Sequence, residues 1–417
     1  MSYAGLGPAV IVDPYSSGSF FASAFAEVGI PVVALMSTNE PPDVYAKSFR
    51  PQDFEHILVA DGEDLDDLIA SLKKLEPRCI LTGCESGVEL TDRIGPVVLP
   101  ELSNLPARSQ ARRHKGEMAE ALRDAGVPSM RQICTNSIAE VADWIEREAL
   151  QGHDLVIKPP KSASTDGVFK VQAGGNWREK FLMLLGSVNR LGITNDKLVV
   201  QEYLYGDEFA VDTVSYAGEH SVASICRYRK VDNGPFMAIY DRMDWMAADF
   251  PEAGVLRAYA IQVLNAVGMR YGTSHIEIMM TELGPRLIEI GARPHGGGHP
   301  QFCRHATGDS QVHRIARSFA ESGLSRLDYE LKTHLTVVFL LCRRGGHVTN
   351  RAALDAIQDL RSHHFSKIHI QQGDLLEPTQ DLFASLELGF VALSHKDPDL
   401  IAADTETIRS LELQIFN

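Results

Sequence analysis

The stretch that decides the fold is SHIEIMMTELGPRLIEIGARPHGGGH, residues 274–299. Its first half alternates in the manner of a β-strand and places Glu277 on the face opposite to its two isoleucines. The Gly284–Pro285 pair predicts a tight turn, after which a second strand returns with Leu287 and Glu289 on a common face. Antiparallel pairing across that turn brings Glu277 and Glu289 together among aliphatic neighbours.

Two carboxylates on neighbouring strands of an apolar hairpin are costly to bury unless a cation neutralises them. Oxygen ligands of this kind suit Mg²⁺, which takes one or two carboxylates and completes its shell with water and substrate phosphates. The alternative is that Glu277 and Glu289 are ordinary solvated strand residues. The rest of the chain decides between the two interpretations.

Length and composition set the broad class. A chain of 417 residues suggests two to four domains, and 44% hydrophobic with 23% charged residues is typical of a globular protein with a real core. The net charge of −15 argues against nucleic-acid partners and against an anionic membrane surface. We expect no secretory leader and no membrane span, and six scattered Cys residues indicate reduced thiols, so the expected compartment is the cytoplasm.

The opening segment predicts a parallel α/β domain. Residues 9–12 and 32–36 are apolar strands around a helical pattern, but no GxGxxG motif supports a dinucleotide site. Glu85 follows a predicted strand at 79–82, at the sheet edge where open α/β folds place ligands. It is either a substrate contact or a residue at a helix N-terminus.

A second segment indicates a phosphate-covering hairpin. The strand 154–158 runs into PPKSASTDG, residues 159–167, whose small polar tip offers backbone N–H groups and hydroxyls beside Lys158 and Lys161. The Walker A spacing is absent, and the alternative is a mobile solvent loop.

A third segment suits a nucleoside. The apolar strand 197–201 leads into a short connection whose backbone can bind an adenine edge, and Glu208 can hold ribose hydroxyls. The alternative is a plain β-connection. Arg227, Arg229 and Lys230 form the local basic cluster that an anionic substrate needs on so acidic a chain.

Further elements complete the expected architecture. Periodicity predicts helices over 110–125, 181–191, 254–267 and 309–322, the last of them after the glycine run. From residue 334 onward the pattern of strands and helices indicates a small α+β module.

Several of these motifs occur in a fixed order. Lys115 precedes a Gly-Val-Pro turn and is followed by DLVIKPPKSASTDGV, VVQEYLYGDEFAVDTVS and HIEIMM…RLIEIGAR. Together they resemble the ATP-grasp superfamily over roughly residues 5–311. The I-E-x-x-x-R pattern and the opening VDPYSSG…GIPVVAL are similar to its carboxylate–amine ligases, the L-amino-acid ligases that make dipeptides and the dapdiamide-type ligases of peptide antimetabolite and antibiotic biosynthesis.

The resemblance implies an α/β and α+β multidomain protein with the ATP-grasp fold. It implies a pre-ATP-grasp domain at 1–109, lobe A at 110–200, lobe B at 201–325 and a C-terminal module at 326–417. ATP contacts, Mg²⁺ ligands (Mn²⁺ being an alternative ion) and a catalytic residue are carried over by position. The ATP contacts are Lys115, Lys158, Ser162, Ser164, Thr165, Gly167, Gln201, Glu202, Tyr203, Leu204 and Glu208, the metal ligands Glu277 and Glu289, and the catalytic residue Arg293.

One position departs from many ATP-grasp enzymes. They place Asn, a further Mg²⁺ ligand, two residues after the second Glu, and here that residue is Gly291. A small residue at this place is typical of the amino-acid ligase group. It leaves the shell of a second Mg²⁺ open.

The reaction implied is a two-step, ADP-forming ligation of a small carboxylic acid or amino acid to an amino acid. The acid is first phosphorylated to an acyl phosphate, and the amine then displaces phosphate. Arg293 offers a two-point contact to the carboxylate or oxyanion, and we expect His295, Gly296, Gly297 and Gly298 to line the acceptor side. The sequence does not identify the base for the amine; Asp241, His275 and His295 are the candidates.

Alternatives remain at this point. One is a purine-pathway-like carboxylate ligase. Another is a carboxylase, although the chain has no biotin-carrier-like segment. A third is an NAD oxidoreductase, although the chain has no GxGxxG motif. A non-catalytic nucleotide-binding regulatory protein is the fourth. The expected partners are small molecules, with a homodimer possible.

Overall fold

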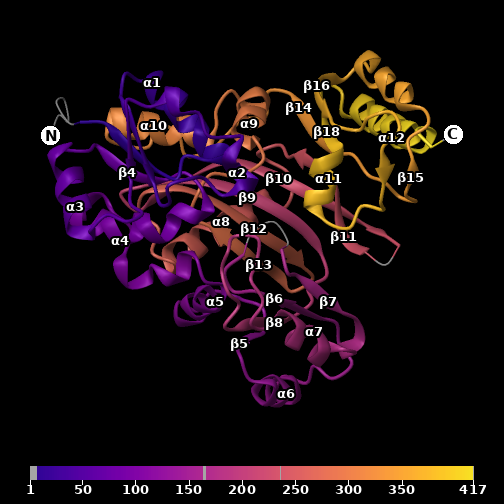
Figure 1. Cartoon of the computed structure of the whole chain (residues 1–417), viewed down its shortest axis with the longest axis horizontal. Coiled ribbons are helices and arrows are strands. Elements are labelled where there is room, and N and C mark those ends of the chain that lie inside the picture. The colour runs from indigo at the N-terminus through magenta and orange to yellow at the C-terminus, as the bar shows by residue number, and fades with distance from the viewer. Residues whose placement is uncertain (1–6, 163–165, 235, 417) are drawn as a thin grey trace.

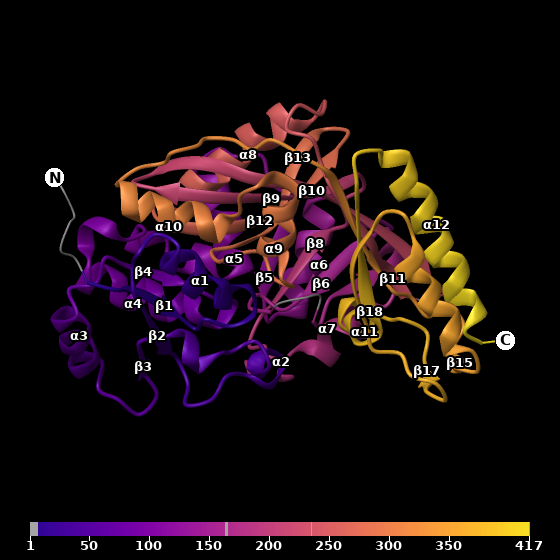
Figure 2. The same cartoon turned by 90° about the horizontal axis from the view of Figure 1, so that it is seen from above.

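The computed structural model describes residues 7–162, 166–234 and 236–416. Three parts of the chain gather around one large sheet, with the N-terminal domain and the C-terminal segment at opposite ends and a small lobe between them (Figures 1 and 2). Within the described residues, no helix has the length and apolar character needed to cross a membrane.

The N-terminal domain is the predicted parallel α/β unit. Its four strands lie in the order β3-β2-β1-β4, and alternate residues of each strand face opposite sides. Val10 and Val33 pack against helices α3 and α4, whereas Ile11 and Ala34 pack against helix α1 and the distant α10. The elements are β1 Ala9–Val12, α1 Phe20–Ala26, β2 Val32–Met36, α2 Asp43–Ala46, β3 His56–Val59, α3 Leu65–Lys74, β4 Cys79–Thr82 and α4 Val88–Val98.

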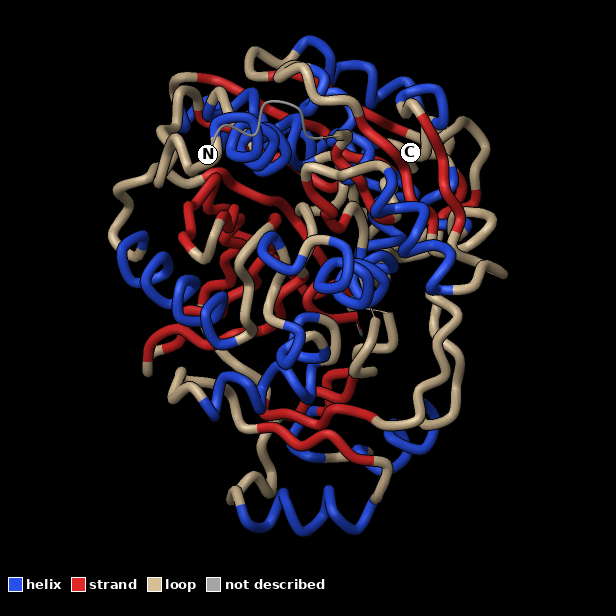
Figure 3. Tube along the Cα trace, turned by 90° about the vertical axis from the view of Figure 1, so that its left-hand side faces the viewer, coloured by secondary structure: helices blue, strands red, loops and turns tan. Residues whose placement is uncertain are grey.

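Lobe A is a separate small sheet. Its antiparallel strands lie in the order β5-β8-β6-β7, and Trp144 and Phe181 from its two helices fill its core. Figure 3 shows this sheet at one end of the molecule with a helix on its outer side. The elements are β5 Gln132–Thr135, α6 Ile138–Arg147, β6 Leu155–Lys158, β7 Phe169–Val171, α7 Trp177–Leu184 and β8 Leu198–Glu202.

The central sheet has eight strands in the order β13-β12-β9-β10-β11-β14-β18-β16. It joins the predicted lobe B to the C-terminal segment, because β14 pairs with β11 through Arg242 and Val338. Its strands are β9 Asp207–Tyr216, β10 Glu219–Asn233, β11 Phe236–Trp245, β12 Gly272–Thr281, β13 Gly284–Gly291, β14 His334–Phe339, β16 His363–Ile368 and β18 Gly389–His395. The division of the chain at 109, 200 and 325 stays a prediction.

Helices cover this sheet and connect it to its neighbours. Helix α5 packs on α8, since Met118 and Leu122 share a core with Leu256 and Val263. The remaining elements are α5 Lys115–Asp124, α8 Ala253–Ala266, α9 His299–Thr307, α10 Gln311–Glu321, α11 Leu382–Leu388, α12 Pro398–Gln414 and the two-stranded pair β15 Gly346–His347 and β17 Leu375–Leu376.

Two predicted helices need correction, and one helix was not predicted. The helix expected over 110–125 begins at Lys115, and the one expected over 181–191 is α7, which ends at Leu184. The helix expected over 309–322 is α10, Gln311–Glu321, and the separate helix α9 before it, which starts at His299, was not expected. Gly298 and Gly308 flank α9 in the left-handed region with φ of 78° and 80°, so the glycine run begins this helix and Gly308 ends it.

Candidate active site

One cavity of about 1080 Å³ lies between the lobes and takes in most of the predicted site. The predicted residues that line it are Lys115, Lys158, Ser162, Gly167, Gln201, Tyr203, Leu204, Glu208, Glu277, Glu289, Arg293, His295, Gly296 and Gly297. Ser164 and Thr165 lie outside the described residues. Residues from four separated segments of the chain therefore meet at one place.

Two predicted site residues do not line this cavity. The Glu202 carboxylate turns to Arg131, with 2.6 Å between Glu202 Oε2 and an Arg131 guanidinium nitrogen. The amide of Gly298 donates to Ser17 Oγ at 3.2 Å and starts α9. The Glu202 side chain and the Gly298 amide thus contact other protein residues instead of the cavity.

The hairpin brings its two carboxylates together by means of a β-bulge. Glu277 pairs directly with Glu289, but Ile278 pairs with Leu287, so Ile288 is an extra residue on β13. The prediction that Leu287 and Glu289 share a face is wrong, because the bulge turns Leu287 into the core and leaves Glu289 beside Glu277 in the cavity. A strict period of two could not anticipate this.

Positive groups surround the carboxylate pair. Lys115 Nζ lies 2.9 Å from Glu289 Oε1, and His275 Nε2 lies 3.2 Å from Glu277 Oε1. Burial raises the pKa of Glu277, but its hydrogen bond to His275 and the charge of that ring outweigh burial and lower the pKa to about 2. Both carboxylates are oxygen ligands facing a cavity, which fits the Mg²⁺ that the fold implies.

Lys158 is the unpaired cation of the site. Within the described residues its ammonium makes no hydrogen bond or ion pair, although the residue is only 5% exposed. Burial, and next the nearby Lys115, lower its pKa to about 8. A buried cation without a partner that lines a cavity fits an anion such as a phosphate.

The part of the cavity for which a nucleoside is predicted has a second unsatisfied group. Gln201 Oε1 is buried without a hydrogen-bond partner among the described residues, and it lines the cavity. Glu208, by contrast, already accepts from Lys230 Nζ at 2.8 and 2.7 Å. Burial raises the pKa of Glu208 in spite of Lys230, so this pair balances its own charge and any ribose must compete with it.

The predicted basic cluster is largely neutralised within the protein. Arg227 pairs with Asp207, and Arg229 Nε lies 2.8 Å from Asp244 Oδ2. With Lys230 on Glu208, each member of the cluster has a carboxylate partner. The cluster therefore shapes the cavity wall more than it supplies free charge.

Arg293 is held by a residue from the N-terminal domain. Its Nε lies 3.0 Å from Glu85 Oε2, while Glu85 Oε1 lies 3.2 Å from a nitrogen of Arg113. Burial raises the pKa of Glu85, but the charges of Arg113 and Arg293 outweigh it and lower the pKa overall. A substrate contact or a helix-terminal role was predicted for Glu85. In the structure its two carboxylate oxygens contact these two arginines.

Gly291 gives the arginine its room. A Cβ at this position would lie 3.2 Å from both Cζ and Nε of Arg293 and 3.3 Å from Glu85 Oε2. The guanidinium therefore crosses the place where many ATP-grasp enzymes carry a metal-binding Asn. A glycine at position 291, where this chain differs from those enzymes, is therefore explained by the space that Arg293 needs.

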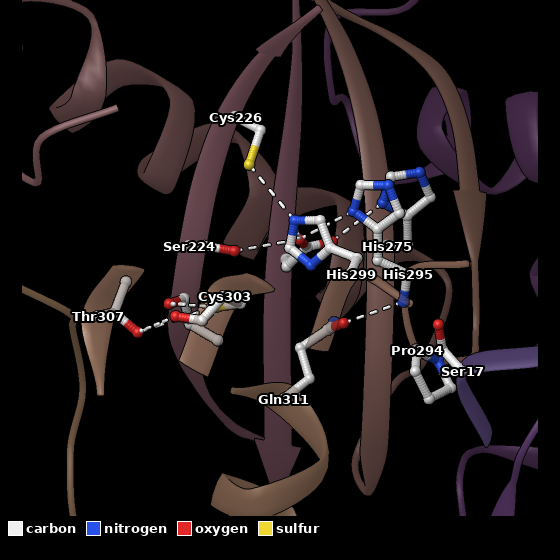
Figure 4. A network of polar contacts seen from close by, with 12 residues as sticks. Ser17, Ser224, Cys226, His275, Pro294, His295, His299, Cys303, Thr307 and Gln311 are labelled. Carbon is white, nitrogen blue, oxygen red and sulfur yellow. Dashed lines mark hydrogen bonds and ion pairs between the residues drawn. The ribbon is translucent and has the colours of Figure 1, made fainter. Parts of the chain in front are cut away.

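A buried network that sequence reasoning missed lies behind the carboxylates (Figure 4). Asp212, fully buried on β9, lies 3.0 Å from His275 Nδ1, 3.1 Å from His295 Nδ1 and 3.2 Å from His299 Nε2, and accepts from Ser224 Oγ at 3.1 Å. The histidine rings stack, with centroids 3.9 Å apart in both neighbouring pairs. A lone Asp in the apolar run FAVDTVS was the signal that could have revealed it.

The network fixes the charge of each ring. Burial lowers the pKa of His275, but Asp212 and Glu277 outweigh burial and raise it to about 9. Burial and the charged His275 then lower the pKa of His295 to about 4. Burial, and next the neighbouring His295, keep the pKa of His299 well below its ordinary value. At neutral pH one ring is charged and two are neutral.

Of the three candidate bases, Asp241 also lines the cavity, but both of its carboxylate oxygens face arginines. Arg409 lies 2.9 Å from Asp241 Oδ1, and Arg242 lies 2.7 Å from Oδ2. His275 and His295 line the cavity beside the carboxylate pair.

Comparison with known proteins agrees with this geometry. A family model described as an ATP-grasp domain matches residues 151–300. Dapdiamide A synthase of Enterobacter agglomerans is 28% identical, over 98% of this chain and 96% of that protein.

Solved structures share the fold over nearly their whole length. An L-amino acid ligase from Bacillus licheniformis superposes with a TM-score of 0.71 at 16% identity, covering 97% of each chain. A carboxyaminoimidazole ribonucleotide synthase from Aspergillus clavatus, complexed with ATP, gives 0.69 at 16% identity over 98% of this chain and 99% of the other. The predicted ATP-grasp fold is confirmed.

Proposed function

We propose that this chain, which belongs to the ATP-grasp superfamily and is an ADP-forming ligase, joins a small carboxylic acid to the amino group of an amino acid through an acyl phosphate. The observation that carries the proposal is the pairing of Glu277 with Glu289 inside a cavity that also holds Lys158 and Arg293. The full-length similarity to dapdiamide A synthase supports the amide-forming class.

The carboxylate pair and the lysines would hold the triphosphate end. Glu277 and Glu289 would hold Mg²⁺, which would neutralise part of the phosphate charge. Lys158 is available for phosphate oxygens, and Lys115, which contacts Glu289 at 2.9 Å, would turn to them when that carboxylate serves as a metal ligand. Phosphoryl transfer needs such positioning and charge more than covalent help.

Arg293 would hold the reacting acid. Glu85 fixes its Nε side, so the remaining guanidinium edge can bind the carboxylate of the first substrate by two points and later the oxyanion of the acyl phosphate. The carboxylate takes up the γ-phosphoryl group, and the amine then displaces phosphate. Gly296 and Gly297 leave room beside this centre.

The nucleoside would lie toward lobe A. Gln201 Oε1, which lacks a donor, is placed to accept from an exocyclic amine, and Tyr203 and Leu204 line the same end of the cavity. Glu208 would bind ribose hydroxyls only in competition with Lys230. Ser162 and Gly167 flank the segment for which we propose a phosphate-covering role.

The test is phosphate and ADP release with ATP and Mg²⁺ across pairs of amino acids and small carboxylic acids, with Glu289→Ala beside the wild type. Release that depends on the pair and disappears in the variant supports the ligase and identifies its substrates. AMP and pyrophosphate as products would exclude the acyl phosphate. ATP binding without release for any pair would favour a non-catalytic nucleotide-binding protein, and release with an aminoimidazole ribonucleotide alone would favour the purine-pathway class.

A further inference from the structure

We propose that Tyr228, His295 and Asp212 form a hydroxyl–imidazole–carboxylate relay that removes a proton from the incoming amine, an inference that rests on the proposed function. Tyr228 and His295 line the cavity, whereas Asp212 lies behind them, fully buried. In this relay Tyr228 and His295 are the catalytic pair, and Asp212 is a positioning residue.

The geometry orders the three groups in a chain. Tyr228 Oη lies 2.9 Å from His295 Nε2, and His295 Nδ1 lies 3.1 Å from Asp212 Oδ2. Because Asp212 is an acceptor, the proton of the neutral ring sits on Nδ1, and Nε2 accepts from the tyrosine hydroxyl. Burial keeps the pKa of Tyr228 well above its usual value, so the hydroxyl carries its proton at neutral pH.

The main chain fixes the position of the imidazole. The amide of His295 donates to Gln311 Oε1 at 3.0 Å, and Gln311 Nε2 donates in turn to the carbonyl oxygen of Ser274 at 2.7 Å. His295 also follows Arg293 by two residues. His295 and the arginine that would hold the acyl group line the same cavity.

A metal centre is a poorer explanation of the same cluster. Asp212, His275 and His295 have ligand atoms within 4.8 Å of one another. Their two rings, however, are stacked at 3.9 Å with a 30° tilt, and each Nδ1 faces a different oxygen of Asp212. Nitrogen lone pairs on stacked rings do not converge on one ion, whereas one N–H donor from each of these rings on Asp212 accounts for both of their distances to it.

The proton balance requires such an acceptor. An amino acid arrives with an ammonium group, and its nitrogen must lose two protons to form an amide. The amine nitrogen forms a bond to the acyl carbon, and the bond between that carbon and the bridging oxygen of the phosphate breaks. One proton leaves with the phosphate as HPO₄²⁻. The other passes to the oxygen of Tyr228 while the proton of Tyr228 moves to His295 Nε2. The weakly basic His295 then releases it to water as the product leaves.

Hydroxylamine separates this step from the rest of the reaction. It is largely uncharged at neutral pH, so its attack on an acyl phosphate leaves only the proton that phosphate removes. We expect Tyr228→Phe and His295→Gln to lower amide formation by about a hundredfold, the usual size of a general-base contribution, while hydroxamate formation changes only a few-fold. Asp212→Asn should shift the ratio in the same direction.

A buried tyrosine away from the cavity is the matched control. Tyr329 donates its hydroxyl to the carbonyl oxygen of Met246 at 2.8 Å, and Tyr329→Phe should leave the ratio of amide to hydroxamate unchanged. Equal loss of both products in Tyr228→Phe and His295→Gln, or full retention of amide formation, would overturn the relay. A wild type that forms neither ADP nor hydroxamate with any acid would instead refute the proposed function.

Discussion

Glu85 Oε2 lies 3.0 Å from Arg293 Nε, although the two residues are 208 positions apart in the chain. The contact joins the N-terminal domain to the segment just after β13, the second strand of the hairpin that carries Glu277 and Glu289. Since Glu85 is 3% exposed and also faces Arg113, it neutralises two buried cations at once. The position of Arg293, the proposed catalytic residue, thus depends on a residue of the N-terminal domain, outside lobes A and B.

Replacing Glu85 by Gln should lower the turnover rate by roughly 100-fold, because a misplaced reacting group has that effect. We expect kcat to fall more than the KM for ATP changes, and the two uncompensated arginines to lower the unfolding free energy by about 3 kcal/mol. Steady-state kinetics and thermal unfolding measure both effects. Glu146→Gln, at an exposed position on α6, is the control, and unchanged kcat in Glu85→Gln would contradict the role.

Gly291→Ala should displace the guanidinium of Arg293, since the new methyl group would lie 3.2 Å from its Nε. We expect a loss of activity of about tenfold or more with little change in stability, because a flexible side chain can move aside. Gly254→Ala is a matched control, as a Cβ there meets nothing within 4 Å. Equal activity of the two variants would argue that Arg293 has no fixed position.

ATP binding should weaken as pH rises through about 8, the pKa of Lys158 in the protein without nucleotide. The sign follows because phosphate binds the charged ammonium, so above this pH binding must take up a proton. Initial-rate measurements across this range should show a rising KM for ATP. In Lys158→Arg the guanidinium stays charged and the KM should be flat; an identical rise in both proteins would assign the titration to another group.

An apolar part of the cavity wall predicts selectivity for apolar amino acids. It consists of lining residues that belong to one hydrophobic cluster, namely Phe302, Phe339, Leu386 and Phe390. Phe390→Ala should raise the KM of the best amine substrate about tenfold and favour larger side chains, since pocket contacts of this size discriminate by 10–200-fold. Leu375→Ala, at a 63% exposed position, is the control, and unchanged preference in Phe390→Ala would place the amine elsewhere.

Local patterns made much of this architecture predictable. The hairpin, with Glu277 opposite Glu289, follows from alternation and a tight turn within a few residues. The cavity brings Lys115, Lys158 and Arg293 to that pair in agreement with the order of the motifs. Such signals are readable because each depends on neighbours in the chain.

The remaining features depend on distant neighbours and were out of reach. Asp212 meets His275 and His295 across 63 and 83 positions, and a single sequence contains no trace of that pairing beyond an acid in an apolar strand. The bulge at Ile288 depends on the register of two paired strands. The basic cluster at 227–230 was visible, but its neutralisation by acids from other strands was not.

The eight-stranded sheet has a mechanical consequence. It hydrogen-bonds the carboxylate hairpin, through β9, β10 and β11, to the C-terminal strands that contribute to the apolar part of the cavity wall. These two regions cannot separate without breaking backbone ladders, so they move as a single rigid body. The small sheet of lobe A lies outside these ladders and joins the rest of the chain through the connections 125–131 and 203–206, so its rotation would break none of them.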